Sequence, residues 1–100
     1  MLYLTDMLTA KKLQALGFTL FEANAKTMRS MLEDEEWQSH IRKQSNADLL
    51  SRILDIKIDV NKEDVIIAEL KKYDILVTFS IKRSKKQNKD NVIFYFVVIM

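Results

Sequence analysis

The chain closes with Ile75-Leu76-Val77-Thr78-Phe79-Ser80-Ile81, then Lys82-Arg83-Ser84-Lys85-Lys86-Gln87-Asn88-Lys89-Asp90-Asn91, then Val92-Ile93-Phe94-Tyr95-Phe96-Val97-Val98-Ile99-Met100. Two apolar, strand-forming runs on either side of a polar, turn-forming segment are the pattern of a β-hairpin. The segment between them carries five of the 16 basic residues, namely Lys82, Arg83, Lys85, Lys86 and Lys89. Because positive charge on a projecting loop often contacts phosphate, the last quarter predicts a hairpin with a basic tip.

The final run, residues 92–100, is almost continuously apolar. A strand that is exposed on one side alternates apolar and polar residues, whereas this run needs cover on both faces. One face can meet helices of the same chain and the other a second subunit. The run therefore favours a homodimer through the C-terminal strand, with a two-sided core inside one chain as the alternative.

The region before the hairpin begins with helical patterns. Apolar residues recur at helical spacing over residues 6–16 and stop at Gly17, the only glycine and a natural left-handed C-terminal cap. Thr19 and Glu22 form a capping box, which predicts a second helix from Leu20 to about Leu32. The sequence therefore predicts two helices joined by a short turn.

The middle of the chain changes from helical to alternating spacing. Carboxylates at 34–36 indicate a helix start before Trp37 and Ile41, and a cap at 45–48 precedes a further helix through Leu54. Residues 54–60 alternate apolar and charged side chains, which predicts a half-buried strand. Residues 61–74 fit a short helix or a strand, and the cap and spacing favour the helix.

The predicted fold class is α+β in a single domain, residues 1–100. An N-terminal helical cluster, helix-turn-helix-like, packs on a small antiparallel sheet that ends in the C-terminal β-hairpin. The length of 100 residues, with 48% apolar and 30% charged residues, suits one globular domain.

Charge and composition limit the function classes. The net charge is only +2, with four acidic residues at 33–36 and a net +4 over residues 81–100. The absence of cysteine excludes disulfides, thiolate metal sites and cysteine nucleophiles, and it fits a cytoplasmic location. No apolar run reaches the ~20 residues that span a bilayer, so no membrane partner is expected.

Catalytic signals are weak. His40 is the only histidine and is expected at the surface without a catalytic role. The chain has no glycine-rich phosphate loop, metal-ligand cluster or nucleophile motif. The prediction is a protein that is not an enzyme, with no catalytic residues, no metal and no cofactor.

The first functional hypothesis is DNA binding. Residues 9–32 match the outline of a helix-turn-helix, in which the second helix enters the major groove. The nucleic-acid contacts would come from two places: Asn24, Lys26 and Arg29 on that helix, and Lys82, Arg83, Lys85, Lys86 and Lys89 at the hairpin tip. An αα-hairpin that only supports the core, and a tip that only keeps the hairpin soluble, are the alternatives.

The second hypothesis is protein binding. The acidic block Glu33, Asp34, Glu35 and Glu36 directly precedes Trp37, the only tryptophan. An aromatic side chain beside charged residues suits an interface anchor. The protein would then be an inhibitor or adaptor of a phage or mobile element that binds a host protein.

Two resemblances bear on these hypotheses. Residues 8–18, with Ala23, Ala25, Met28 and Arg29, resemble a small uncharacterised helical family encoded near integrases on Gram-positive conjugative transposons. That resemblance implies a DNA-associated accessory role on a mobile element. A first strand at 1–4, followed by helices and antiparallel strands, resembles the RelE-like ribosome-dependent mRNA-cleaving toxins. The chain lacks their arginine- and tyrosine-rich pattern, so the toxin is a distant alternative to a winged-helix-like DNA-binding regulator.

Overall fold

The protein is a five-stranded mixed sheet with helices on both faces, as seen in a computed structural model that describes residues 1–84 and 89–100, with side chains for all of these except 83, 84, 89 and 90. The elements in chain order are β1 (Leu2–Thr5), α1 (Ala10–Ala15), β2 (Phe21–Ala23), α2 (Ala25–Asp34), β3 (Trp37–His40), α3 (Gln44–Leu54), the 3₁₀ turn η1 (Ile67–Glu69), β4 (Ile75–Ser84) and β5 (Lys89–Val98). The α+β class predicted from the sequence is confirmed.

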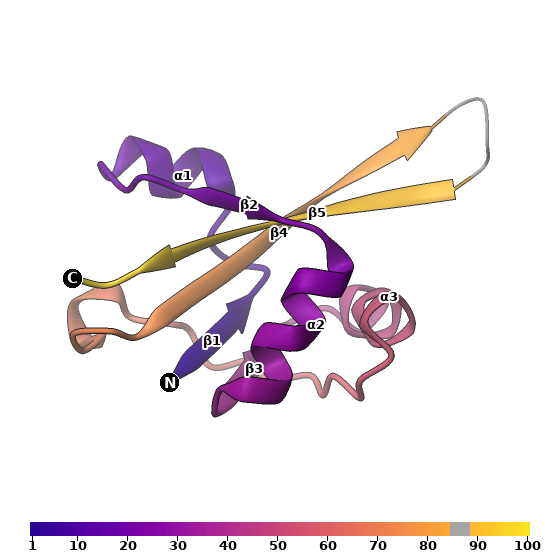
Figure 1. Cartoon of the computed structure of the whole chain (residues 1–100), viewed down its shortest axis with the longest axis horizontal. Coiled ribbons are helices and arrows are strands. Elements are labelled where there is room, and N and C mark those ends of the chain that lie inside the picture. Colours follow the sequence, from indigo (N-terminus) through magenta and orange to yellow (C-terminus); the bar gives the residue numbers. More distant parts are fainter. Residues whose placement is uncertain (85–88) are drawn as a thin grey trace.

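The strands lie in the order β2-β5-β4-β1-β3 (Figure 1). β4 and β5 pair antiparallel from Ile75↔Val98 to Ser84↔Lys89, and β2 adds antiparallel to β5. β1 is parallel to both β3 and β4. The predicted antiparallel sheet is therefore wrong in part, because the N-terminal strand lies between two parallel neighbours.

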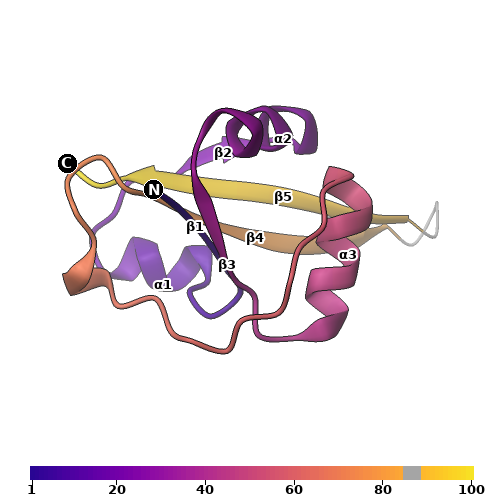
Figure 2. The same cartoon turned by 90° about the horizontal axis from the view of Figure 1, so that it is seen from below.

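Two apolar clusters lie on the two faces of the sheet. Side chains of alternate strand residues point to opposite faces, so Val77 and Phe94 lie on one face and Leu76 and Val97 on the other. The larger cluster joins Val77 and Phe94 to Met28 of α2 and Leu50 of α3. The smaller joins Leu76 and Val97 to Leu13 of α1. Figure 2 shows α2 and α1 on opposite sides of the sheet.

The end of α1 follows the predicted capping by Gly17. Gly17 has a φ of 94°, its N–H donates to the Gln14 carbonyl, and the N–H of Phe18 donates to the Leu13 carbonyl. These two bonds are the Schellman motif. The predicted Gly17 cap is confirmed, although α1 starts at Ala10, after Thr9 as N-cap, rather than at residue 6.

The second helix starts later than its capping-box pattern predicts. Residues 21–23 form β2 and pair with residues 94–96 of β5, and α2 begins at Ala25 after Asn24 as its N-cap. Pairing satisfies backbone groups along β5 and places Phe21 against Phe96, with ring centroids 5.6 Å apart. Because β2 separates the two helices, no tight turn joins them, and the helix-turn-helix predicted for residues 9–32 is wrong.

Residues 37–40 form the strand β3 where a helix was predicted. Trp37 and Ile41 are four residues apart, which fits a helix, but residues 37–40 pair in parallel with residues 2–5 of β1. β1 offers unpaired backbone groups on that side, and satisfying them outweighs a weak local preference. Only His40 of the four β3 residues is buried, so the strand leaves little apolar signal in the sequence.

The segment from 55 to 74 has little regular structure. The alternation after Leu54 buries Ile58, but it forms only an isolated bridge, Ile41↔Val60, instead of the predicted strand. In residues 61–74 the only regular element is the single turn η1, so the favoured helix is also wrong. Apolar alternation here places side chains on the core without forming a strand ladder.

The start of α3 is held by a residue that is distant in sequence. Its N-cap, Lys43, makes no side-chain capping bond. The carboxylate of Asp6 instead accepts from the N–H groups of Arg42 (2.9 Å) and Lys43 (3.1 Å) and from the side chain of Asn46 (2.9 Å). A carboxylate at a helix N-terminus also complements the helix dipole. Asp6 therefore connects the end of β1 to α3.

Within residues 1–84 and 89–100, none of the helices has the length and apolar character that a bilayer crossing requires.

Candidate functional site

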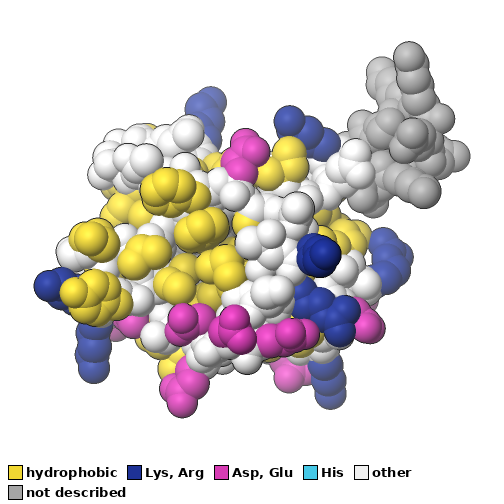
Figure 3. All heavy atoms as spheres, viewed as in Figure 1, with side chains coloured by type: hydrophobic (Ala, Val, Ile, Leu, Met, Phe, Trp, Pro, Cys, Tyr) yellow, Lys and Arg dark blue, Asp and Glu magenta, His cyan; other side chains and the backbone are white. Residues whose placement is uncertain are grey.

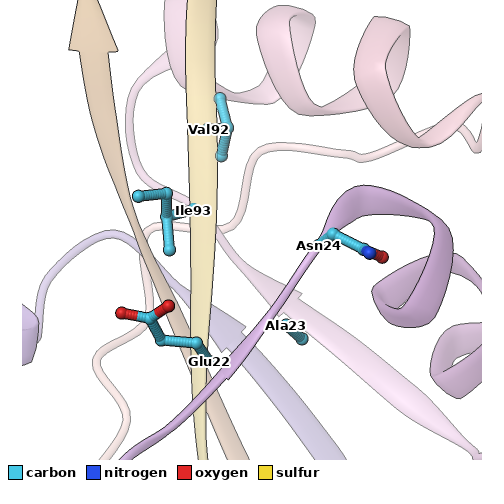
Figure 4. Close-up of a pocket in the computed structure, with 5 residues that line it drawn as sticks. All are labelled: Glu22, Ala23, Asn24, Val92 and Ile93. Atoms are coloured by element: carbon cyan, nitrogen blue, oxygen red, sulfur yellow. The ribbon is translucent and has the colours of Figure 1, made fainter.

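The helical residues predicted to contact nucleic acid are on or next to α2, but most have partners within the chain. The side-chain oxygen of Asn24 accepts from the N–H of Thr27 at 2.8 Å as the N-cap of α2. Arg29 pairs with Glu33 at 3.2 Å and with Asp55 at 3.7 Å. Lys26 is exposed on the same helix. A groove of about 310 Å³ beside Asn24 is lined by Glu22, whose carboxylate repels phosphate (Figure 4).

Of the residues predicted for the basic tip, Lys82 and Arg83 lie at the outer end of β4 and Lys89 at the outer end of β5. These ends, residues 81–84 and 89–92, project beyond the rest of the molecule and are called the β4–β5 arm (Figure 1). Lys82 is exposed on the arm. Lys85 and Lys86, and the side chains of Arg83 and Lys89, lie outside the described residues. Figures 1 and 2 both show the described part of the arm apart from α2.

The residues predicted for protein binding, in contrast, are contiguous and exposed. Glu33, Asp34, Glu35 and Glu36 are exposed at the end of α2 and in the link to β3. Among the described side chains, Glu33 has an ion-pair partner, Arg29, and the other three carboxylates have none. Trp37, which follows them, is half-buried at the start of β3.

A groove of about 460 Å³ runs beside Trp37 along the outer edge of the sheet. Its wall consists of Trp37, Gln38, Ser39, Asp59, Asn61 and Glu63. Asp59 and Glu63 add two exposed carboxylates, and Asp59 is 3.9 Å from the ammonium of Lys57. The acidic block, Trp37 and this groove together are called the acidic edge.

The backbone of β3 is partly open along the acidic edge. The Glu36 carbonyl accepts from the N–H of Leu2, so backbone groups of 36 and 38 point towards β1. Those of Trp37, Ser39 and Ile41 consequently point away from β1. The Ile41 carbonyl accepts from the N–H of Asn61, which covers the far end of the edge. The Ser39 hydroxyl donates to the Asp59 carbonyl, so the covering segment also reaches Ser39, and the open part is the backbone of Trp37, beside the groove.

His40 is buried, which corrects its predicted surface position. It is 6% exposed, its ring lies 5.7 Å from that of Tyr3, and its Nδ1 is 2.9 Å from the Glu63 carbonyl oxygen. Because a carbonyl oxygen only accepts, Nδ1 carries the proton in this arrangement. His40 thus attaches the 58–63 segment to the end of β3.

Asp6 lies near His40, at the carboxyl end of β1, next to the start of α3. Partial burial by itself raises the pKa of Asp6. The hydrogen bonds from the Asn46 side chain and from the N–H groups of Arg42 and Lys43 outweigh that effect, so its pKa lies below its ordinary value of 3.8. Asp6 therefore stays ionised. Its hydrogen bonds hold the start of α3 against β1, the strand that pairs with β3 of the acidic edge.

The structure also has an exposed apolar surface whose residues were not identified from the sequence. Phe21, Ile75, Phe96 and Val98 point to the same face of the sheet as Phe94, beyond the area that α2 covers, and are called the apolar patch. Phe21 is 55% exposed. Figure 3 shows a broad hydrophobic area on this face, bordered along one side by acidic side chains. The apolar composition of residues 92–100 was the only signal for it in the sequence.

A scan against protein-family models and a search of curated proteins gave no match to this chain.

Proposed function

We propose that the protein is a non-enzymatic inhibitor or adaptor that binds another protein through the acidic edge. The observation that carries this proposal is the position of Trp37, which lies on an open strand edge, directly after the acidic block and beside a groove lined by Asp59 and Glu63. Tryptophan is the residue most enriched among interface anchors, and here its half-buried ring is already fixed by packing on the core.

The open backbone of β3 favours an extended segment as the ligand. A free strand edge pairs with an added strand through main-chain hydrogen bonds, and side-chain pockets give the selectivity. The outward N–H and C=O groups of Trp37 supply such a pairing site, before Ser39, whose hydroxyl bonds to the Asp59 carbonyl. The groove beside them leaves room for the added chain.

Charge favours a basic ligand. The acidic edge carries six carboxylates, at positions 33–36, 59 and 63, of which Asp59 and Glu63 line the groove. Two of the six pair with a basic side chain among the described residues. Opposite charges across an interface accelerate association and select the partner, and salt weakens this contribution. The partner is therefore a protein with an exposed, extended and basic segment.

Trp37 provides the test, because it is the only tryptophan and lies in the site. We expect its fluorescence to change saturably when a peptide of alternating lysine and threonine is added. The same peptide with glutamate in place of lysine should bind at least ~10-fold more weakly, a difference of about 1.4 kcal/mol.

Two matched double substitutions test the role of charge, one at the acidic edge and one elsewhere on the protein. Glu35→Lys with Glu36→Lys should abolish the preference for the lysine peptide, whereas Glu22→Lys with Glu69→Lys, which makes the same charge change away from the groove, should retain it. Equal responses to both peptides, or a preference that survives the Glu35 and Glu36 changes, would contradict the proposal.

Nucleic-acid binding by the β4–β5 arm is the second candidate, supported by the arm's projection and by exposed Lys82. In this proposal the arm contacts phosphates as the wing of a winged-helix protein does, and the protein acts as a DNA-binding regulator. Such contacts supply affinity that depends on salt and carries little sequence selectivity.

A gel-shift series at rising salt tests the arm. Replacing Lys85, Lys86 and Lys89 with alanine should weaken binding to DNA and lower the salt slope by up to about 3, roughly one for each phosphate contact removed. Alanine at Lys11 and Lys12 of α1 is the control and should leave the slope unchanged. Absence of binding at low salt excludes this candidate.

A further inference from the structure

The apolar patch lies apart from the β4–β5 arm and adjoins the acidic edge only at Glu35 and Glu36, which border both (Figure 3). It belongs to the open end of the sheet, where β2, β5 and β4 extend past α2 (Figures 1 and 3). The rings of Phe21 and Phe96 lie 5.6 Å apart, and Val98 pairs with Ile75 in the next row of the same face. A contiguous exposed apolar area of this kind marks an interaction site more often than it marks a free surface.

A groove continues from the patch around the edge of the sheet. It has a volume of about 500 Å³, and Phe18, Phe21, Val98 and Met100 line it. Phe21 stands between the groove and the patch, and more than half of its surface is exposed. The same surface therefore presents a protruding aromatic side chain and an apolar hollow next to it.

The border of the patch carries both signs of charge. Lys71 and Lys72 are exposed at the end of the sheet next to β5, because the N–H of Tyr73 donates to the Ile99 carbonyl. Glu35 and Glu36 are exposed at the same end next to β1, where the Glu36 carbonyl accepts from the N–H of Leu2. A surface with separated positive and negative borders is complementary to itself under a two-fold rotation.

We infer that the apolar patch binds a second copy of this chain and forms a two-fold homodimer. Phe21 of each copy enters the groove beside Phe21 of the other, and the Phe96 and Val98 side chains meet across the axis. The two-fold axis lies in the plane of the patch and bisects its charged borders, so that Lys71 and Lys72 of one copy face Glu35 and Glu36 of the other.

Self-association fits the patch better than a partner of uniform charge does. A uniformly basic partner would be repelled by Lys71 and Lys72, and a uniformly acidic one by Glu35 and Glu36. The patch itself carries no charge, so a second apolar patch buries it without leaving an unpaired charge. In an isologous interface each copy supplies both the protruding ring and the hollow that receives it.

Sedimentation velocity over a concentration series tests the dimer. The wild-type mass should rise from the 11.8 kDa of a single chain towards twice that value. Phe21→Asp and Val98→Asp should each raise the dimer dissociation constant at least ~10-fold, because each buries a charge in an apolar interface. Ile66→Asp is the matched control: Ile66 is 52% exposed in the loop before η1, and its substitution should leave the constant unchanged.

Charge exchange tests the orientation. Changing Lys71 and Lys72 to glutamate, or Glu35 and Glu36 to lysine, should weaken the dimer, and the two changes together should restore it. A combined variant that dimerises no better than either partial one would overturn the arrangement. A single-chain mass at the highest concentration reached would overturn the dimer itself.

A cysteine variant tests the same contact without placing a charge in the interface. The chain has no cysteine, so Phe21→Cys introduces the only thiol. Under mild oxidation it should form a disulfide-linked dimer much faster than Ile66→Cys does. Equal rates for the two variants would show that the patch of one copy does not meet that of another, and circular dichroism verifies that each variant is folded.

Discussion

Asp6 shows how a single residue links parts of the chain that are far apart in sequence. Its carboxylate accepts three hydrogen bonds from residues 36 to 40 positions away, and these fix the start of α3 against β1. No local pattern marks this role, because the partners become neighbours only when β1 and β3 pair. The role of Gly17, in contrast, was predicted correctly from the sequence, because its cap depends only on residues of the same turn.

Removing the Asp6 carboxylate should destabilise the protein. Asp6→Ala leaves the N–H groups of Arg42 and Lys43 without their acceptor, and we expect the free energy of unfolding to fall by roughly 1–2 kcal/mol in urea titrations. Asp48→Asn is the control on the same helix, because Asp48 is exposed and its bond from Gln44 joins two exposed side chains. Its effect should stay below about 0.5 kcal/mol.

The contribution of Asp6 should depend on pH in a defined direction. Because its pKa in the folded protein lies below the ordinary value of 3.8, ionised Asp6 stabilises the fold fully above that value. The contribution is lost as the pH falls through the lowered pKa. The stability difference between wild type and Asp6→Asn should therefore be constant near neutral pH and shrink below about pH 4. A difference that grows on acidification would contradict this assignment.

At the scale of elements, the region from Thr19 to Ala25 shows how strand pairing overrides a local helix signal. Thr19 and Glu22 have the spacing of a capping box, yet Phe21 and Ala23 pair with β5. The neighbouring strand, and not the local sequence, decides the structure of these residues. The same holds for β3, where Trp37 and Ile41 have helical spacing but the free side of β1 sets the structure.

Two substitutions distinguish a helix that starts at Ala25, after Asn24, from one that starts at Leu20, after Thr19. Asn24→Ala removes the bond to the N–H of Thr27 and should lower the free energy of unfolding by about 1 kcal/mol. Thr19→Ala alters an exposed residue before β2 and should change it by less than about 0.5 kcal/mol. Thermal or urea unfolding measures both. The reverse order of effects would place the start of the helix at Leu20.

At the scale of the whole molecule, the elements with strong signals were those predicted best. The two long apolar runs at 75–81 and 92–98 lie in β4 and β5, and the helix ending at Leu54 lies where its apolar spacing places it. The acidic block and Trp37 are adjacent in sequence and stay adjacent in space. The apolar patch joins Phe21 to residues more than 50 positions away, so its membership follows from the strand order and could not be read from spacing.

The acidic edge and the apolar patch adjoin at Glu35 and Glu36, and the β4–β5 arm lies apart from both. The acidic edge follows β3. The apolar patch covers the end of the sheet beside β2, and the β4–β5 arm extends from the opposite end of β4 and β5. The modest net charge of +2 is thus the sum of strongly charged regions of opposite sign. A dimer through the patch would present two acidic edges and two arms, and a bivalent ligand would bind it with an effective concentration set by the spacing of the copies.

The position of β1 between β3 and β4 also sets the order in which the chain can fold. β1 precedes both strands with which it pairs, residues 37–40 and residues 75–77. Closing the larger of these loops requires nearly three quarters of the chain, and such long-range pairing slows folding. On the ribosome, β1 must wait with an unpaired side until β4 emerges. A fragment that ends before Ile75 would contain all three helices and still lack the strand that closes the centre of the sheet.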